Sequence, residues 1–509
     1  MLKKIISFLS FILLLICLPA FTQAAEPKQY SDEVNVSVYL KSSLTITLNG
    51  TYQLVNKDTG TKTAVPESTV LTVSKDTSGV SVSYTGFSQK SAKGFDLQEL
   101  SGTSKLAVFT ADTPLRRGAT SSYEIIKTFK AGESANYLDS FTNTQGQVWH
   151  KVSSGSLSGW VLSTTVRLSD ASSLSTAKVS NGTTYRGSFF LKPNGSQVEV
   201  INFLGMEDYL KGVVPSEMPA SWPKEALKAQ AIAARSYAAN TMMLTSTAAS
   251  QVYKGYSGED SRTNTAIQET AGLVAKYNGK PIQTFFFSTS GGRTANVGDV
   301  WNSNQASYPY LVSVDDPYES SPYSSWSETF TSAQLLKNFG FTDTSATIYD
   351  LSLSKTGANG EVRGVTIKTS AGDKTVTGNE SVIRKLFPLP NSSVYNQLYS
   401  NWFDAVLNGS ASGLTVQTAS GTANISDMKG QTVQTANGQV TLSDSKVSIQ
   451  TASGIVTNEG SGITSVTLNG KGWGHRIGMS QYGAKGFAEK GWKAEQIITH
   501  YFKGTTVSK

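Results

Sequence analysis

Short runs in which apolar and polar residues alternate fill the N-terminal part of the chain. VNVSVYL begins at Val34, SLTITLNG at Ser43 and GVSVSYTG at Gly79. Val, Ile, Thr and Tyr at every second position, with Asn-Gly and Asp-Thr-Gly turns between the runs, predict half-buried β-strands. We therefore expect a β-rich domain from about Asn35 to Ser101, within a region that spans residues 30–104.

A second run of short strands predicts a separate module at residues 105–168. It carries three sequence features, which are TPLR at its start, VWHKV in its middle and GWV at its end. On these features it resembles a bacterial SH3-like (SH3b) domain, a small β-barrel that commonly binds cell-wall peptides. Trp149 and Trp160 then lie in the barrel core or contact a ligand, and we expect the core for at least one of them. His150 is expected at the surface, without a role.

The strand pattern returns after a Ser- and Ala-rich linker at residues 169–182, and helices follow it. A short helix is expected at Met206–Val213. The next helix is expected to start after Ser221 or Trp222, with Pro223 at or near its first position, where a missing N–H costs nothing. This helix, KEALKAQAIAARSYAAN, is rich in alanine, so a neighbouring element can approach it closely.

The C-terminal half continues this core region, predicted at residues 183–412, with helices near 332–338 and 380–387. VQTASGTANI, VQTANGQVTL and IQTASGIVTN then recur within residues 413–460 and predict three hairpins with Ser-Gly or Asn-Gly turns. Residues 461–509 predict a strand, a glycine-rich turn and two helices. The whole pattern predicts an α+β fold, a mixed and β-rich multi-domain protein with an Ala-rich helix at the site and a small β-barrel insert.

Residues 1–25 have the pattern of an export signal. MLKK is a basic start, IISFLSFILLLICLPAF is an apolar run, and Thr22-Gln23-Ala24 is a small-residue cleavage site. We expect cleavage near Ala24 or Ala25 and a secreted, wall-associated protein. The alternative is an uncleaved membrane anchor, because Ile5–Phe21 is almost long enough to span a bilayer. Pro19, ahead of the small residues, favours cleavage.

Cysteine content and charge narrow the functional classes. Cys17 is the one cysteine of the chain and lies inside the predicted signal, so the exported form would have no disulfide and no cysteine-based zinc site. Lys and Arg number 44 against 37 Asp and Glu, a formal net charge of +7. This excess is spread along the chain without a basic run. We therefore expect no nucleic-acid binding, and the charge is compatible with a weak attraction to an anionic cell wall.

Four separated segments carry the functional prediction. They are EDYLKGVVPSEMPASWPKEALKAQAIAARSYA, SQVYKG, FFFSTSGGRTANVGDVW, and a last one that runs from GKGWGHRIGMSQYGAKGFAEKGW to IITHYFKGT. In this order they resemble the stage II sporulation protein D / amidase enhancer family, over about Asn35 to Thr505 with the insert and the repeats as interruptions. The resemblance implies peptidoglycan remodelling. Sporulation members of the family cleave peptide-free glycan strands as lytic transglycosylases, and enhancer members stimulate an N-acetylmuramoyl-L-alanine amidase.

The resemblance places the catalytic acid of the family at Glu217, between Pro215 and Pro219. A lytic transglycosylase needs one carboxyl group, which protonates the glycosidic oxygen and then accepts the proton of the sugar's own C6 hydroxyl. This group must start protonated near neutral pH, and apolar neighbours such as Val213 and Met218 favour that state. The structural alternative is a surface glutamate near a helix start, favoured by the helix dipole.

Other residues of the matching segments are candidate substrate-binding residues, and four of them have a structural alternative. The two on the Ala-rich helix would otherwise brace the helix against the sheet, and the two serines would otherwise bond a turn. The histidine is expected to be more exposed than a core residue, in a glycine-rich turn, which favours a role in the site. The candidates are Arg235, Tyr237, Ser288, Ser290, His475, Gln481 and Tyr482.

Two positions depart from the family pattern. Some members have cysteine before QVYKG and histidine before STSGG and hold zinc with such residues. Here these positions are Ser250 and Phe287. Neither side chain offers a thiolate or an imidazole, so we expect no zinc at this place, no other metal and no cofactor.

Three functions follow as alternatives. The first is a secreted enzyme that cuts wall glycan strands, with glycan strands and wall peptides as its partners. The second is a non-catalytic enhancer that binds the wall or a wall amidase. The third is a purely structural wall-binding protein. The combination of an acid, polar helix residues and a glycine-rich site segment in one chain favours the first.

Overall fold

The computed structural model describes residues 26–101, 106–131, 133–154, 157–169, 175–389, 396–409, 414–418, 421–425, 431–435, 437–443, 447–451, 454–458 and 462–509. The predicted export signal at residues 1–25 lies outside them. The chain divides into two compact units. The first holds the described residues up to Tyr209 together with Met243–Ser257, and the second holds Leu210–Met242 and Gly258–Lys509. Across these ranges, no helix is both long and apolar enough to span a membrane.

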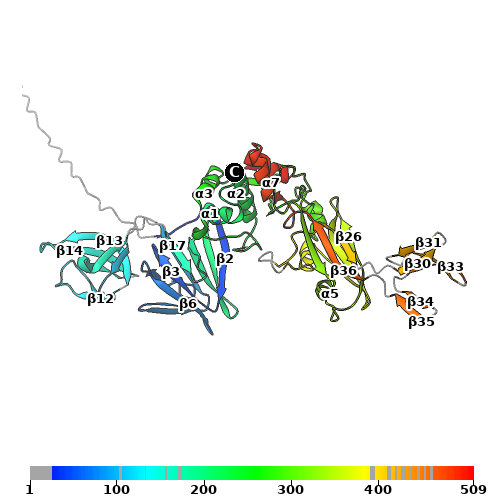
Figure 1. Cartoon of the computed structure of the whole chain (residues 1–509). Coiled ribbons are helices and arrows are strands. Elements are labelled where there is room, and N and C mark those ends of the chain that lie inside the picture. Colours follow the sequence, from blue (N-terminus) through cyan, green and yellow to red (C-terminus); the bar gives the residue numbers. More distant parts are fainter. Residues whose placement is uncertain are drawn as a thin grey trace, which may run out of the picture. The chain divides into compact units, whose positions relative to one another are not determined.

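Two β-sheets form most of the first unit (Figure 1). Leu44, Ile46 and Leu48 are buried and the residues between them are exposed, which confirms the predicted alternation. The larger sheet has the order β21 (Leu244–Thr245), β2 (Glu33–Lys41), β20 (Gln197–Gly205), β19 (Ser188–Asn194), β9 (Phe95–Ser101), β4 (Tyr52–Asn56), β5 (Lys62–Val65), with β1 (Glu26–Pro27) also beside β9. The smaller sheet has the order β18 (Thr184–Arg186), β17 (Thr176–Val179), β3 (Ser43–Asn49), β6 (Val70–Asp76), β7 (Gly79–Tyr84), β8 (Phe87–Ser91).

A further sheet of the first unit is made only of strands between Leu106 and Ser169. Its order is β12 (Ile125–Phe129), β11 (Thr113–Arg116), β15 (Leu157–Leu162), β14 (Val148–Ser154), β13 (Ser134–Thr142), β10 (Leu106–Phe109), β16 (Val166–Ser169), with the short helix η1 (Ser163–Thr165) before its last strand. These strands enclose their own small core, in which the rings of Phe109 and Phe129 stack 4.2 Å apart. Trp149 is buried, whereas Trp160 is partly exposed. The likeness of this module to SH3 domains stays a prediction.

His150 differs from its expected surface position. Its side chain is buried, its Nδ1 lies 3.0 Å from Ser140 Oγ, and its ring meets Tyr137 edge-on at 5.3 Å. The register shift of β13 between Tyr137 and Asp139 changes the strand alternation beside it, which the sequence pattern did not reveal.

Helices dominate one half of the second unit. They are the end of α1 (Met206–Glu217), α2 (Lys224–Ala239), α3 (Ser261–Glu269), α4 (Val297–Val300), α7 (Gln481–Glu489) and α8 (Ala494–Tyr501), with the short helix η3 (Gln305–Ser307). Another short helix, η2 (Tyr256–Gly258), spans the sequence boundary between the two units. Small strand pairs connect them: β22 (Val274–Tyr277) lies between β23 (Lys280–Pro281) and β38 (Thr506–Ser508), and β24 (Phe286–Phe287) pairs in parallel with β37 (Met479–Ser480).

Two helix boundaries correct the sequence prediction. α1 does not end at Val213 but continues through Pro215 to Glu217, because a proline in the last turn removes only one backbone hydrogen bond. The N-cap of α2 is Pro223 itself, and its carbonyl oxygen accepts from the N–H groups of Ala226 and Leu227. Neither Ser221 nor Trp222 caps this helix.

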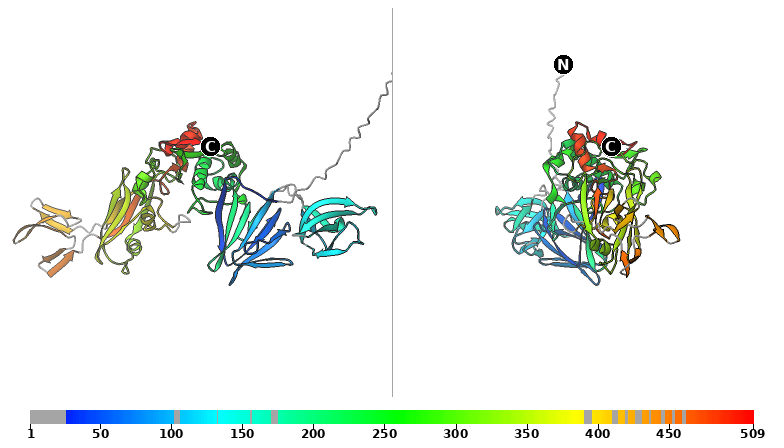
Figure 2. Two further views of the ribbon diagram at one scale, coloured as in Figure 1. Left: turned by 180° about the vertical axis from the view of Figure 1, so that it is seen from behind. Right: turned by 45° about the vertical axis from the view of Figure 1, so that its right-hand side comes forward.

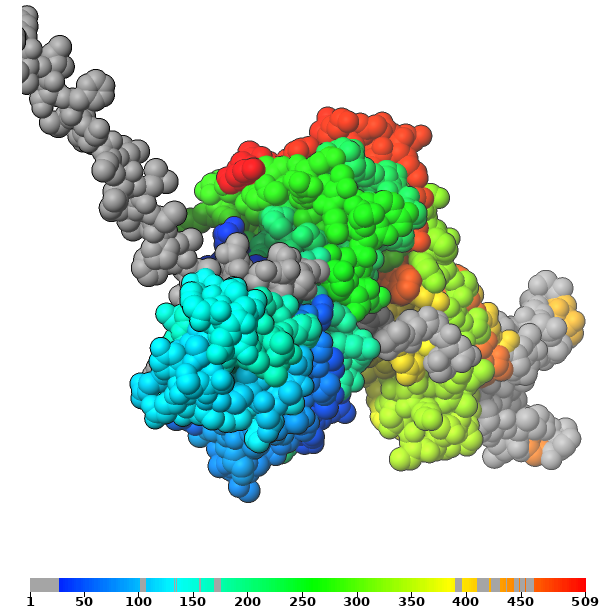
Figure 3. Space-filling view, turned by 90° about the vertical axis from the view of Figure 1, so that its left-hand side faces the viewer, coloured from blue at the N-terminus to red at the C-terminus, as the bar shows by residue number. Residues whose placement is uncertain are grey.

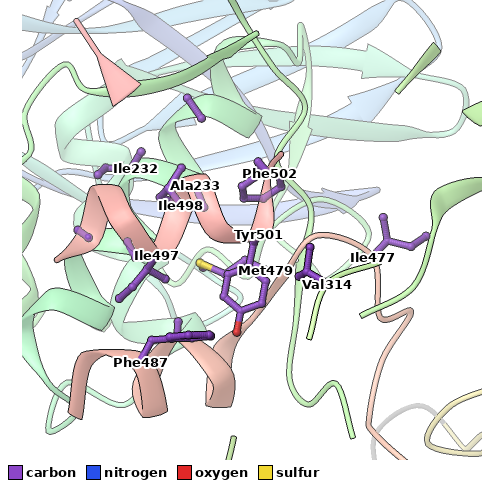
Figure 4. Close-up of a cluster of buried hydrophobic side chains, with 14 of the residues drawn as sticks. Ile232, Ala233, Val314, Ile477, Met479, Phe487, Ile497, Ile498, Tyr501 and Phe502 are labelled. Carbon is purple, nitrogen blue, oxygen red and sulfur yellow. The ribbon is translucent and has the colours of Figure 1, made fainter. Parts of the chain in front are cut away.

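The helices share one apolar core (Figure 4). Small residues of α2, such as Ala229 and Ala233, are fully buried in it, and Phe487, Ile498 and Tyr501 come from α7 and α8. In the space-filling view of Figure 3, the red C-terminal residues lie against green residues of the same unit. The alanines of α2 thus allow the C-terminal helices to pack closely against it.

A sheet with two helices forms the other half of the second unit. Its order is β25 (Trp326–Thr331), β36 (Ile463–Gly470), β26 (Ile348–Thr356), β27 (Glu361–Thr369), β28 (Lys374–Thr377), with β29 (Phe403–Gly409) also beside β36. Strands of this sheet from distant parts of the sequence lie side by side in Figure 2. α5 (Ser332–Asn338) and α6 (Glu380–Lys385) contribute to its core, where the sequence predicts helices.

The three repeats form three separate hairpins, as predicted. They are β30 (Leu414–Thr418) with β31 (Gly421–Ile425), β32 (Thr432–Thr435) with β33 (Gly438–Thr441), and β34 (Val447–Thr451) with β35 (Gly454–Asn458). Gly421, Gly438 and Gly454 start the return strands at φ values of 124°, 112° and 125°, a conformation that other residues rarely adopt.

Candidate functional site

Glu217 is the last residue of α1, at the point where the chain turns toward α2. Its side chain is half-buried, and Val213, Val214 and Met218 beside it are buried. The N–H of Met218 still bonds to the carbonyl of Val214 at 2.9 Å, and the N–H of Trp222 bonds to that of Pro219 at 2.9 Å. A helix end followed by a hydrogen-bonded turn therefore fixes the backbone on both sides of this carboxyl group.

Gln481 brings a third element to Glu217. Its side-chain Nε2 lies 3.4 Å from Glu217 Oε2 and 3.5 Å from Gln230 Oε1 on α2. One amide nitrogen carries two N–H donors and can serve both acceptors. Gln481 is the first residue of α7, whose N-cap Ser480 accepts from the N–H of Gly483 at 3.1 Å. The carboxyl group of Glu217 thus lies where the last residue of α1 meets the first residue of α7. The middle of α2 joins this contact through Gln230.

Gln230 is a site residue that sequence reasoning did not select. It is completely buried, and a polar amide among alanines was the available signal. A buried amide usually needs partners, and Gln481 supplies one for the Gln230 oxygen, whereas the Gln230 Nε2 has no hydrogen bond in the described part of the chain.

Tyr482 follows Gln481 and links α7 to the segment of the two candidate serines. Its backbone N–H donates to the carbonyl of Ser288 at 3.0 Å, and its ring meets Trp222 edge-on at 4.9 Å. Trp222 also lies 5.8 Å below the ammonium group of Lys485. Aromatic side chains and a cation therefore flank the turn that follows Glu217.

The two candidate serines have different environments. Ser288 is partly exposed, and its hydroxyl lies 3.1 Å from that of Thr289. Ser290 is completely buried, and its Oγ accepts from the N–H of Gly292 at 3.0 Å. Ser290 thus makes the turn-bonding contact that was its structural alternative, whereas the exposure of Ser288 leaves it open to a ligand.

Glu319 organises this turn, although no sequence signal pointed to it. Its carboxylate accepts from the backbone N–H groups of Ser290 and Gly291, the latter at 2.9 Å. It also accepts from Ser480 Oγ at 2.8 Å, just before α7. One acid therefore joins the serine segment to the start of α7.

Arg235 and Tyr237 both come from α2 and contact residues outside this helix. Arg235 is buried, and its guanidinium donates to the backbone carbonyl of Leu273 at 3.0 Å, a contact that braces α2 against the segment before β22. The ring of Tyr237 meets that of Phe285 edge-on at 5.9 Å.

His475 is half-buried, which agrees with the expectation that it is more exposed than a core residue. Its ring packs among Phe285, Phe287 and Trp301, with centroid distances of 6.3, 5.5 and 5.1 Å. Its Nδ1 accepts from the N–H of Ile477 at 3.1 Å, so the proton of the neutral ring is on Nε2. Burial lowers the pKa of His475 to about 4. The imidazole is therefore neutral near pH 7.

Arg476 beside it holds the glycine-rich turn in place. It is completely buried, donates to the carbonyls of Ser290 and Arg293 at 2.9 and 2.8 Å, and forms a salt bridge of 3.3 Å with Glu361 on β27. Its guanidinium also lies 4.1 Å from the ring centre of Trp402. A positive φ of 63° in a non-glycine residue shows that these contacts determine its backbone conformation.

The positions expected to lack zinc ligands have other contacts. Ser250 Oγ accepts from the N–H of Thr245 at 3.1 Å, and Phe287 packs on His475. Within the described ranges, no group of three or more His, Cys, Asp or Glu side chains is arranged to hold a metal ion. The metal-free site stays a prediction.

Comparison with known proteins places this site in a family context. A family model described as stage II sporulation protein matches residues 194–277, the range that contains Glu217, Arg235 and Tyr237. The amidase enhancer of Bacillus subtilis (strain 168) is 32% identical over 308 residues, which is 59% of this chain and 40% of that protein. The chain therefore spans well under half of this relative's length.

Stage II sporulation protein D gives a longer match relative to its own length. The protein of Bacillus subtilis (strain 168) is 29% identical over 328 residues, 60% of this chain and 74% of that protein. The protein of Bacillus amyloliquefaciens has the same identity and coverage. Residues 194–277 thus match the stage II sporulation protein family, and about three fifths of the chain is similar to proteins named amidase enhancer and stage II sporulation protein D.

Proposed function

We propose that this protein is exported and remodels peptidoglycan, and that it cuts wall glycan strands as a lytic transglycosylase with Glu217 as its single acid/base. The observation that carries this proposal is the position of Glu217, half-buried at the end of α1 and in contact with Gln481. The family relationship supports a function in the cell wall during sporulation.

The chemistry needs one carboxyl group in two protonation states. Protonated Glu217 donates its proton to the glycosidic oxygen, and the C1–O bond to the leaving sugar breaks. The C6 hydroxyl oxygen of the sugar that carries C1 bonds to this carbon, and the carboxylate of Glu217 accepts the hydroxyl proton. The products are a 1,6-anhydro end and a free hydroxyl end, and Glu217 is protonated again. No water enters the reaction.

Gln481 suits a carboxyl group that changes its protonation state. Its amide N–H can donate to the carboxylate that forms when the proton has moved to the leaving group, which favours the charged form. Gln230 holds the same amide nitrogen from the other side, and its burial keeps that contact away from water. These contacts support a role for Gln481 as the residue that orients Glu217.

The second candidate function is the enhancement of a wall amidase without cleavage. It is favoured by the 32% identity to a protein named amidase enhancer, which covers 59% of this chain. In this case the partner would be a wall N-acetylmuramoyl-L-alanine amidase. The Leu106–Ser169 module would add affinity for wall peptides under either function, because it presents Trp160 and Phe141 at its surface.

Product analysis distinguishes the two functions. Purified protein is incubated with peptide-free glycan strands and with intact sacculi, and the soluble products are identified by mass spectrometry. Release of fragments with 1,6-anhydro ends supports the proposed enzyme. Release by a wall amidase that rises when this protein is added, without any cut in the glycan, supports the enhancer function. Fragments with reducing ends would contradict the mechanism, because they require water.

A further inference from the structure

Asp316 is a buried carboxyl group that the proposed chemistry does not use. It is 1% exposed, and neither of its carboxyl oxygens has a hydrogen bond of standard geometry, although the hydroxyl groups of Ser290, Tyr501 and Ser480 lie around it. Burial and the negative charge of Glu319 raise the pKa of Asp316 to about 7. A charged carboxylate in this setting would be costly, so the surroundings favour the protonated form.

Asp316 packs directly against the first turn of α7. A Cβ atom at Gly483 would lie 2.1 Å from Asp316 Oδ2 and 2.0 Å from the hydroxyl of Tyr501, and one at Gly486 would lie 2.0 Å from the carbonyl oxygen of Tyr318. Figure 4 shows Tyr501 pointing from α8 toward α7. The segment from Asp316 to Glu319 therefore follows a face of α7 that only glycine leaves open.

This contact lies one residue away from the site. Ser480 Oγ donates to Glu319 Oε2 at 2.8 Å and accepts from the N–H of Gly483 at 3.1 Å. Gln481, the next residue, meets Glu217 at 3.4 Å. The position of the Gln481 amide therefore depends on how Asp316 and Glu319 hold the first turn of α7.

The other charged groups near Asp316 do not neutralise it. The guanidinium of Arg476 interacts electrostatically with Glu319 and donates a hydrogen bond to the carbonyl of Ser290. Arg293 forms a 3.4 Å ion pair with the exposed carboxylate of Asp315, and His500 Nε2 lies 2.8 Å from the backbone carbonyl of Asp315. None of these three side chains is hydrogen-bonded to the carboxyl oxygens of Asp316.

We propose that Asp316 is a positioning residue for the Glu217–Gln481 contact. Its protonated form keeps the first turn of α7 packed toward Glu217. Its ionisation loosens this turn and lowers the cleavage activity at higher pH. This inference rests on the proposed function of Glu217. The physical reason is that an ionised Asp316 repels Glu319, which holds the same turn, and is buried away from solvent. The dipole of α7 favours a negative charge at its N-terminus and offsets only part of this cost.

The test compares Asp316→Asn with Asp315→Asn. Asparagine imitates the protonated carboxyl group, and Asp315 is the matched control because its side chain is 78% exposed. The folded wild type keeps the proton up to about pH 7, whereas the unfolded chain releases it near 3.8, so stability from this group is lost as pH rises through that window. We expect this loss in the wild type and in Asp315→Asn, and not in Asp316→Asn.

Hydrogen exchange and cleavage then report on the site itself. After correction for the intrinsic pH dependence of exchange, we expect the amides of the first turn of α7 to lose protection above about pH 7 in the wild type and to keep it in Asp316→Asn. Cleavage of peptide-free glycan should fall with a midpoint near pH 7, and Asp316→Asn should move that midpoint upward by at least about one pH unit. In a Gln481→Ala background, Asp316→Asn should no longer move it.

The outcomes separate this inference from the proposed function. If Asp316→Asn leaves the pH dependence of exchange and of cleavage as in the wild type, the inference is wrong. If no form cuts glycan at any pH, the proposed function fails, and the exchange profile alone decides on Asp316. If Asp316→Asn removes the pH dependence of hydrogen exchange in the first turn of α7, the inference is supported. If that pH dependence is unchanged, the inference is wrong.

Discussion

The side chains of Glu217 and Gln481 are 264 positions apart in the sequence and 3.4 Å apart in space. This contact joins the end of α1 to the first residue of α7, and the buried amide of Gln230 completes it from α2. The first matching sequence segment and the last one therefore meet at a single carboxyl group. The contact also shows which residues are best suited to test the site.

Gln481→Ala should lower glycan cleavage by about tenfold, because the carboxylate formed during the reaction loses a hydrogen-bond donor. Stability should change by less than about 1 kcal/mol, since both contacts of the amide are long. Gln268→Ala, on the exposed side of α3, is the matched control and should behave as the wild type. Initial rates with peptide-free strands and urea unfolding measure the two effects. Equal rates for the two variants would remove Gln481 from the site.

His475→Asn should make the protein less sensitive to acid. The native imidazole has a pKa lowered to about 4 by burial, against an ordinary value of 6.5. Between these values the unfolded chain binds a proton that the native state does not bind, so stability falls as pH decreases through this window. Asparagine does not titrate there and can still accept from the N–H of Ile477. Urea unfolding at pH 7 and pH 4.5 should give a smaller difference for the variant, and an equal difference would contradict the buried neutral state.

The strands and the general fold could be predicted from the sequence because period-two alternation is a local signal. Leu44, Ile46 and Leu48 were recognisable from their spacing alone, and the three hairpins followed from their repeated turns. Family motifs selected Glu217 and Gln481 as candidates, and the structure brings them together. Helix ends were less predictable, since Pro215 continues a helix that the sequence suggests it would end.

The residues that support the site could not be predicted, because their roles depend on contacts between distant segments. Glu319 lies in no recognisable motif, yet it binds the serine turn and Ser480 together. Arg476 lies in a matching segment, but its partner Glu361 is on a strand 115 positions away. Gln230 was visible only as a polar residue among alanines. Packing, which no local pattern encodes, decides each of these roles.

Glu361→Gln should destabilise the protein by about 3 kcal/mol, because it leaves the charge of Arg476 buried without its partner. Both side chains are at most 1% exposed, and the glutamine keeps the size and the contact with Asn359. The control is Asp404→Asn, which removes a salt bridge to Lys355 from a side chain that is 79% exposed, and it should cost less than about 1 kcal/mol. The free energy of unfolding is measured with denaturant for both variants. Equal losses of this free energy would contradict the interpretation.

The segment from Leu106 to Ser169 should fold alone and bind purified sacculi, because among the described residues its strands pair only with one another and enclose their own core. Phe141 is 51% exposed, and its ring lies 5.9 Å from that of Trp160, near the ammonium group of Lys151. We expect Phe141→Ala together with Trp160→Ala to weaken wall binding by at least about tenfold without unfolding the module. Val148→Ala is the exposed control. A folded module that does not bind sacculi would be a spacer.

Glu217→Gln tests the proposed acid/base directly. Glutamine keeps the shape of the side chain but cannot donate a proton and then recover one, so cleavage should fall by at least about a hundredfold. Folding should barely change, because the substitution is almost isosteric and the backbone on both sides is held by hydrogen bonds of α1 and of the following turn. Glu495→Gln, on the exposed side of α8, makes the same carboxyl-to-amide change and should keep full activity. The products of the wild type should carry 1,6-anhydro ends. A different outcome is that neither Glu217→Gln nor the wild type cuts glycan and that both stimulate a wall amidase equally. The enhancer function then replaces the enzyme, because a carboxyl group that can be replaced by an amide without effect has no part in catalysis.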